Sequence, residues 1–121
     1  MTNVLIADSY KSIRILVEDF LSLMENFSFT IFNKENGEEA WKIIKTENID
    51  LIISGNTMPG MSGLELARKV KAKDSPYKEI PFIFCSGAPG EYQKEIEKLG
   101  AISLPKPYSL IDFQKLVRSL L

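Results

Sequence analysis

The chain has 121 residues, of which 45% are apolar and 26% are charged, and its formal net charge is −1. This length and composition predict one globular domain over residues 1–121, with a hydrophobic core of its own. The charge balance gives no electrostatic footprint for nucleic acid or for a membrane surface, so we expect neither partner for this domain. No apolar run approaches the ~20 residues of a membrane span, and the amino terminus lacks the pattern of a signal peptide. We therefore expect a cytoplasmic location.

Two residue types restrict the chemistry further. The chain contains no histidine, which excludes a Ser-His or Cys-His nucleophile pair, an imidazole metal site and a phosphohistidine. The single cysteine, Cys85, lies in an apolar run over residues 81–85. A lone cysteine in such a run predicts a buried thiol rather than a disulfide or a metal ligand.

Five short β-branched or aromatic runs alternate with longer helical patterns along the chain. Strands are expected over residues 4–7, 29–32, 51–54, 81–85 and 102–104. Helices are expected over residues 13–24, from 36 to 44, from 62 to the breaker at 74–76, over 91–99 and from 109 onwards. Asn36, Ser62 and Ser109 have the side chains of helix N-caps. The alternation predicts an α/β fold with a parallel sheet covered by helices on both faces.

The segment over residues 49–63, IDLIISGNTMPGMSG, resembles the third strand and following loop of two-component receiver domains. In that family an apolar strand ends in Asp and is followed by two residues, Met-Pro-Gly and a helix. The segments VLIADSYKSIR, ENGEEAW, IPFIFCSGA and LPKP fall in the family's order and spacing, so the resemblance covers the whole chain. It implies a flavodoxin-like (βα)5 three-layer sandwich with strand order 2-1-3-4-5, and a signalling module of a phosphorelay rather than an enzyme.

The resemblance assigns the pocket residues, and two of them depart from the family's pattern. Gly55 takes the place of the Asp that accepts the phosphoryl group, and Ser9 takes the place of the second of two adjacent acids that hold Mg2+. Asp8 is then the one carboxylate left. Because Mg2+ needs several oxygen ligands, we expect its binding to be lost or very weak, with Asp8 at most a weak residual ligand and no other cofactor.

The remaining pocket positions are mostly kept. Thr57, Ser86 and Lys106 match the family's pocket, and Lys106 is expected to form an ion pair with Asp8. Lys106–Pro107 matches a pair for which the family predicts a cis peptide, an ordinary trans turn being the alternative. Ser103 falls where receivers carry an aromatic switch residue. The loop SGAPGE, from Ser86, could also form an anion site, although a plain turn is the favoured reading.

Three functions remain open at this point. The leading one is a degenerate receiver, a pseudo-receiver that is not phosphorylated and acts by protein–protein interaction. In the second, a nearby hydroxyl of Ser9, Ser54 or Thr57 accepts the phosphoryl group, although no evident base would activate it. In the third, the emptied crevice binds a small ligand.

The resemblance also implies a partner surface. In the family, the face formed by the helix over 91–99, the strand over 102–104 and the last helix binds a protein partner or a second copy. Here that face presents Tyr92, Lys94, Lys98, Lys115 and Arg118. A solvated basic surface without a partner is the alternative.

Overall fold

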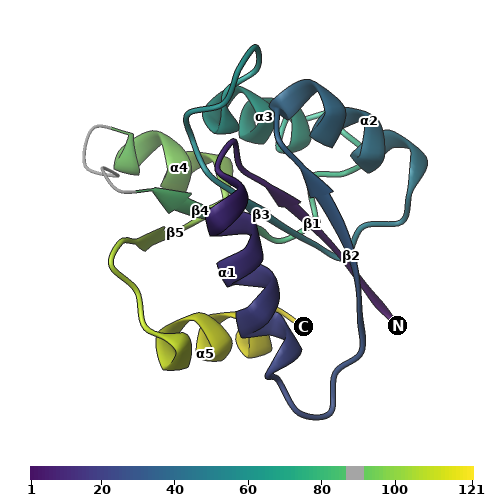
Figure 1. Cartoon of the computed structure of the whole chain (residues 1–121). Helices are drawn as coiled ribbons and strands as arrows, with labels where there is room; N and C mark the ends of the chain where they lie inside the picture. The colour runs from purple at the N-terminus through teal and green to yellow at the C-terminus, as the bar shows by residue number, and fades with distance from the viewer. Residues whose placement is uncertain (87–91) are drawn as a thin grey trace.

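The structure is a computed structural model that describes residues 1–86 and 92–121, with Ser86 described through its backbone alone. The described residues form five strands and five helices in strict alternation (Figure 1). The strands are β1 (Thr2–Ala7), β2 (Phe29–Lys34), β3 (Leu51–Ser54), β4 (Phe82–Ser86) and β5 (Ile102–Pro105). The helices are α1 (Lys11–Ser22), α2 (Gly37–Thr46), α3 (Gly63–Val70), α4 (Gln93–Leu99) and α5 (Leu110–Leu120).

All strand pairs are parallel, and the strand order is β2-β1-β3-β4-β5. Helices α2, α3 and α4 cover one face of the sheet, and α1 and α5 cover the other (Figure 1). This three-layer arrangement confirms the flavodoxin-like fold predicted from the sequence. In a sheet of this order the connections leave β1 and β3 in opposite directions, which opens a crevice at the carboxyl ends of these two strands.

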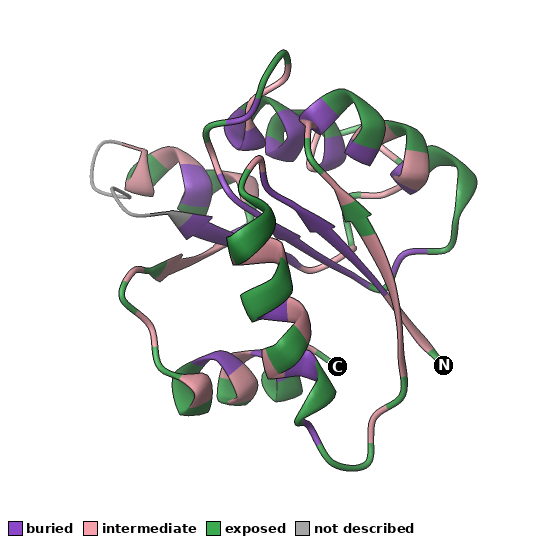
Figure 2. Cartoon of the chain, viewed as in Figure 1, coloured by how far each residue is buried: buried purple, intermediate pink, exposed green. Residues whose placement is uncertain are grey.

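The sheet divides the core into two halves because successive side chains of a strand point to opposite faces. In β1, Leu5 and Ala7 pack under α2 and α3, whereas Val4 and Ile6 pack under α1 and α5. The inner strands β1 and β3 are buried over most of their length (Figure 2). Burial on both faces explains why these strands read as continuous apolar runs.

Several local predictions are confirmed. The Asn36 side chain accepts a hydrogen bond from the Glu39 backbone N–H, and Ser62 and Ser109 cap α3 and α5 in the same way. Cys85 is a free, buried thiol. The Lys106–Pro107 peptide bond is cis.

Within the described residues, no helix is long and apolar enough to cross a membrane.

Helix α3 is shorter than its sequence pattern predicts. It ends at Val70, although the expected breaker begins at residue 74. The Lys71 ammonium group donates hydrogen bonds to the carbonyl oxygens of Lys78, at 2.8 Å, and Ile80, at 2.6 Å. The segment after Val70 forms turns instead of a further helical turn, and these two bonds tie Lys71 to the end of that segment. Helix α4 begins at Gln93 rather than at residue 91, which lies outside the described residues.

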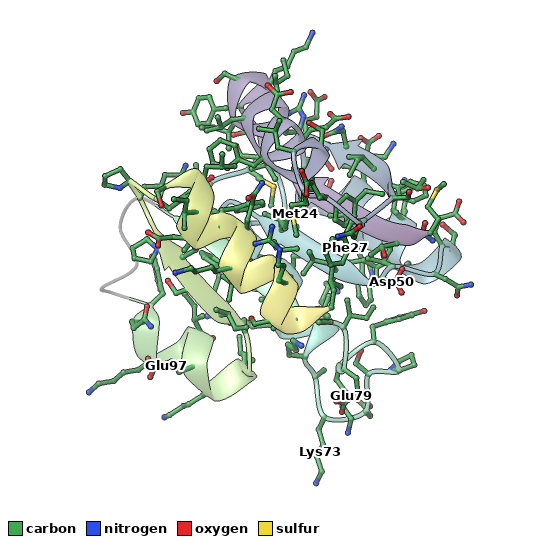
Figure 3. All side chains as sticks on the ribbon, turned by 90° about the horizontal axis from the view of Figure 1, so that it is seen from below. Met24, Phe27, Asp50, Lys73, Glu79 and Glu97 are labelled. Carbon is green, nitrogen blue, oxygen red and sulfur yellow. The ribbon has the colours of Figure 1, made fainter. Side chains whose placement is uncertain are left out.

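The opposite edge of the sheet is formed by the loops that lead into the strands. Figure 3 views the molecule from below and labels Phe27, Asp50 and Glu79, which lie in the loops before β2, β3 and β4. Asp50 Oδ2 accepts a hydrogen bond of 2.8 Å from the Asn3 backbone N–H. The Asp50 carboxylate therefore has a structural role, as the acceptor of this hydrogen bond, and it lies far from the crevice at the carboxyl ends of the strands.

Candidate functional site

The site begins where β1 and β3 end side by side. Ala7 is paired with Ser54 in the parallel ladder, and the Gly55 backbone N–H donates to the Ala7 carbonyl oxygen at 2.9 Å. The next residue of β1, Asp8, donates its backbone N–H to Lys34 of β2 at 3.1 Å. The sheet hydrogen bonds therefore bring Asp8 and Gly55 together at the crevice, as the sequence predicts.

The Asp8 carboxylate lies against the Cα atom of Gly55. A Cβ atom added to Gly55 would overlap Asp8 Oδ2, and its next neighbour would be Asp8 Cγ at 3.0 Å. Asp8 is 5% exposed, and its Oδ1 accepts a hydrogen bond of 2.9 Å from the Tyr10 backbone N–H. One acid thus fills the space into which a side chain at position 55 would project.

The backbone of Gly55 is held from its other side by α3. A Cβ atom added to Gly63 would overlap the Gly55 carbonyl oxygen, so the first turn of α3 can approach this closely because residue 63 has no side chain. The Gly63 backbone N–H donates to the Asn56 carbonyl oxygen at 2.8 Å. Ser54 Oγ donates to the Gly55 carbonyl oxygen at 2.7 Å. The sequence pattern marks Ser62 as a helix cap but does not indicate this role of the next residue, Gly63.

The hydroxyl group of Ser9 is bonded across the crevice. Ser9 Oγ donates a hydrogen bond of 3.0 Å to the Thr57 carbonyl oxygen. That carbonyl is an oxygen that could serve a cation, but here the Ser9 proton already occupies one of its lone pairs. No group of three or more His, Cys, Asp or Glu side chains that could hold a metal ion is found in the described part of the chain. A single carboxylate and a hydroxyl do not fit the oxygen-rich shell of Mg2+.

Lys106 does not pair with Asp8, which corrects one expectation from the sequence. Over residues 1–86 and 92–121, the side-chain ion pair within 4.0 Å joins Arg68 to Glu95. The cation that reaches Asp8 is Arg14, whose Nη1 donates to the Asp8 carbonyl oxygen at 2.5 Å. Opposite charges at one crevice do not suffice for a pair, because the two side chains must also meet at hydrogen-bond distance.

Two polar groups near the end of β5 are buried without a hydrogen-bond partner in the described part of the chain. They are the hydroxyl groups of Ser103 and Tyr108. Ser103 is paired with Phe84 in the sheet, whereas the Tyr108 ring stacks on Phe113. Such unpartnered hydroxyl groups are uncommon in protein interiors. Tyr108 was not singled out from the sequence, since an aromatic residue after Lys-Pro reads as ordinary core.

The Tyr108 hydroxyl lies near the Cys85 thiol, although no hydrogen bond of acceptable geometry joins them. Burial raises the pKa of Cys85 to about 12. Burial also raises the pKa of Tyr108, and the neighbouring Cys85 adds to that effect. Both groups are therefore uncharged at neutral pH, and neither is an activated nucleophile.

Two sequence predictions fall outside the described residues. The Ser86 side chain is one, and the rest of the SGAPGE loop, residues 87–91, is the other. On the predicted partner face, Lys94, Lys98, Lys115 and Arg118 are exposed. Tyr92 is half-buried and packs against the core below α4.

Comparisons with known proteins agree on one family. Residues 4–118 match the family model of the response regulator receiver domain. Sporulation initiation phosphotransferase F of Bacillus subtilis is 27% identical over 119 residues, which cover 98% of this chain and 92% of that protein. A chemotaxis protein CheY homologue of Campylobacter jejuni is 30% identical over 88 residues, 72% of this chain and 65% of the homologue.

A segment of a much longer protein matches as well. The CAI-1 autoinducer sensor kinase/phosphatase CqsS of Vibrio cholerae is 31% identical over 84 residues, 69% of this chain. The matching segment spans 12% of that sensor kinase.

Solved structures support the same fold. The chemotaxis response regulator CheY4 of Vibrio cholerae superposes with a TM-score of 0.83 at 28% identity, covering 100% of this chain and 99% of the other. The response regulator TrrA of Thermotoga maritima, solved in complex with Mg2+ and BeF, gives a TM-score of 0.84 at 30% identity, with 100% of both chains covered.

Proposed function

Since the chain belongs to the family of response regulator receiver domains of two-component systems, we propose that it signals without accepting a phosphoryl group, by binding another protein. Its role is that of a signalling module and not of an enzyme. The proposal treats Gly55 as the degenerate acceptor position and Ser9 as the degenerate metal-ligand position. Asp8, Thr57, Ser86 and Lys106 are the rest of the receiver pocket.

One observation carries the proposal: the Asp8 carboxylate occupies the space beside Gly55. Phosphoryl transfer to a receiver requires a nucleophile and a cation that neutralises the charge of the transferring group. Glycine supplies no nucleophile. Asp8 Oδ2 fills the space where an acceptor side chain would begin, and the donor set around it does not suit Mg2+.

The hydroxyl groups near Gly55 are poor substitutes for the missing acceptor. Ser54 is 1% exposed, and its Oγ donates to the Gly55 carbonyl oxygen. Ser9 Oγ donates to the Thr57 carbonyl oxygen. A hydroxyl becomes a nucleophile when a base removes its proton, and in both cases a backbone carbonyl holds that proton instead. Thr57 is exposed, but the chain has no histidine to activate it.

The proposed partner surface is the face formed by α4, β5 and α5. The exposed Lys94, Lys98, Lys115 and Arg118 lie on its helices together with the exposed acids Glu97 and Asp112, so the face carries mixed charge. A protein partner, or a second copy, with a complementary charge pattern would be steered to this face. Ser103, which takes the place of the family's aromatic switch residue, is too small to report a change at the pocket by moving into or out of β5.

The test is exposure to a small phosphodonor with Mg2+, followed by intact-mass measurement. A receiver domain that carries the acceptor Asp is the positive control, and the expected result for this chain is an unchanged mass. An added mass of one phosphoryl group would overturn the proposal. Peptide mapping would then locate the acceptor among Ser9, Ser54 and Thr57.

A further inference from the structure

An apolar groove lies between α1 and the segment that joins β5 to α5. Figure 1 shows the backbone of these two segments on the α1 and α5 side of the sheet. Its walls are formed by Ile13 and Leu16 of α1 and by Lys106, Pro107 and Tyr108. The groove has a volume of about 450 Å³. Pockets that hold small molecules usually enclose about 300–1,000 Å³, and a few polar groups among apolar side chains fix the ligand's orientation.

Tyr108 gives the groove a firm apolar wall. Its ring stacks on Phe113, with centroids 6.1 Å apart, and meets Phe20 edge to face at 6.3 Å. The Tyr108 hydroxyl is buried beside Cys85 and so does not reach the groove surface. The side of Tyr108 that lines the groove is therefore carbon, as it is for Ile13, Leu16 and Pro107.

Lys106 gives the groove its charge. It is half-buried, it forms no ion pair within 4.0 Å over the described residues, and no acidic side chain lines the groove. A cation at one end of an apolar groove complements an anionic head on an apolar body.

We propose that this groove binds a small apolar carboxylate. The carboxylate head lies near the Lys106 ammonium group, and the apolar body packs against Ile13, Leu16 and the Tyr108 ring. The site is beside the crevice and not inside it, because Asp8, Ser9, Gly55 and Thr57 do not line the groove. The inference goes beyond the proposed signalling role and does not depend on the absence of phosphorylation.

The test uses methyl NMR, with octanoate as the probe and octanol as its uncharged counterpart. The Ile13 and Leu16 methyl signals should shift and saturate with octanoate, while the methyl signal of Ile44, a buried residue of α2 on the other face of the sheet, should not move. Lys106→Gln should weaken octanoate binding about fivefold and leave octanol binding unchanged. Lys42→Gln, at an exposed lysine of α2 on the other face of the sheet, is the matched control and should change neither.

A second variant tests the groove itself. Leu16→Trp should fill the groove and abolish the saturable shift of Ile13, with an unmoved Ile44 signal showing that the fold is kept. The proposal is overturned if octanoate causes no saturable shift, or if Lys106→Gln binds it as well as the wild type. It is also overturned if the Ile13 signal moves with protein concentration alone, since a second copy of the chain would then be the occupant.

Discussion

Ser9 Oγ and the Thr57 carbonyl oxygen are joined by a hydrogen bond of 3.0 Å that links the end of β1 to the loop after β3. A metal-binding receiver would place a cation between these two segments, whereas here they bind each other directly. Beside this bond, the Asp8 carboxylate lies against Gly55, so groups of the protein itself occupy part of the crevice. The proposed signalling state is thus one that needs no ligand at the crevice to hold its loops.

Restoring the acceptor alone should not restore the chemistry. In Gly55→Asp the new Cβ atom would overlap Asp8 Oδ2, and two carboxylates would then share a nearly buried space. We expect the free energy of unfolding to fall by about 1–3 kcal/mol from the steric conflict, with a further loss from like-charge repulsion. Urea denaturation at pH 7 measures this loss.

Gly55→Ala is the matched control for that substitution. It introduces the same Cβ atom without the charge, so the difference between the two variants isolates the repulsion. The Gly55→Asp variant should also remain unphosphorylated by a small phosphodonor with Mg2+, because Ser9 still provides no second acid. A Gly55→Asp protein as stable as the wild type would show that Asp8 turns away freely.

A carboxylate at position 9 should restore some Mg2+ binding, whereas a carboxylate elsewhere on α1 should not. Ser9→Asp removes the hydrogen bond to Thr57 and adds a second carboxylate beside Asp8, which is the kind of ligand that Mg2+ prefers. We expect a measurable Mg2+-dependent rise in melting temperature for this variant and none for the wild type. Ser12→Asp adds the same charge at an exposed position of α1 and should behave like the wild type. If Mg2+ raised the melting temperatures of both variants equally, the effect would come from the added net charge and not from a site at position 9.

Gly63 should be more sensitive to substitution than its place at a helix start suggests. Gly63→Ala would drive a Cβ atom into the Gly55 carbonyl oxygen, so α3 must shift away from the site. We expect a loss of about 2 kcal/mol or more, as for other overpacked interiors. In contrast, Gly100→Ala meets no atom within 4 Å but sits at φ 81°, and should lose only about 1 kcal/mol to backbone strain. Chemical denaturation measures the free energy of unfolding of both variants. The prediction is wrong if Gly100→Ala loses more stability than Gly63→Ala.

Much of the fold could be predicted from the sequence because local patterns report it directly. The apolar run over 51–54 indicated a central strand, and Asn36 and Ser62 marked helix starts that the structure confirms. The early end of α3 could not be predicted in this way. At this helix end the Lys71 ammonium group binds carbonyl oxygens seven and nine residues further along the chain, a contact that no local pattern reports.

The positions of the candidate site could be predicted as well, but not its hydrogen bonds. Strand ends set the positions, so Asp8 and Gly55 meet as expected. The prediction of an ion pair between Lys106 and Asp8 was wrong because it rested on the two charges alone, without the side-chain torsions that set the distance between them. Tyr108 was missed for a related reason: its buried hydroxyl near Cys85 follows from the direction of one ring, which no spacing in the sequence encodes.

Alkaline pH should destabilise the fold through Cys85. The folded pKa of this thiol is about 12, raised from 9.0 by burial, so the unfolded chain loses the thiol proton first as the pH rises. The folded state then binds more protons than the unfolded state, and the free energy of unfolding falls between about pH 9 and pH 12. A single group of this kind contributes up to about 1.4 kcal/mol per pH unit in that window. Tyr108, whose pKa is also raised, acts in the same direction.

Cys85→Ala isolates the contribution of the thiol. Every other titratable side chain is present in both proteins, so the difference in their pH dependence reports Cys85 together with its effect on the neighbouring Tyr108. The wild type should lose more stability than Cys85→Ala between pH 9 and the highest pH at which both still fold, as measured by urea denaturation at each pH. The native thiol should also resist a thiolate-specific reagent at pH 9 and react once urea unfolds the chain. Parallel stability curves for the two proteins, or rapid reaction of the native thiol, would place Cys85 in a more solvated environment than the structure shows.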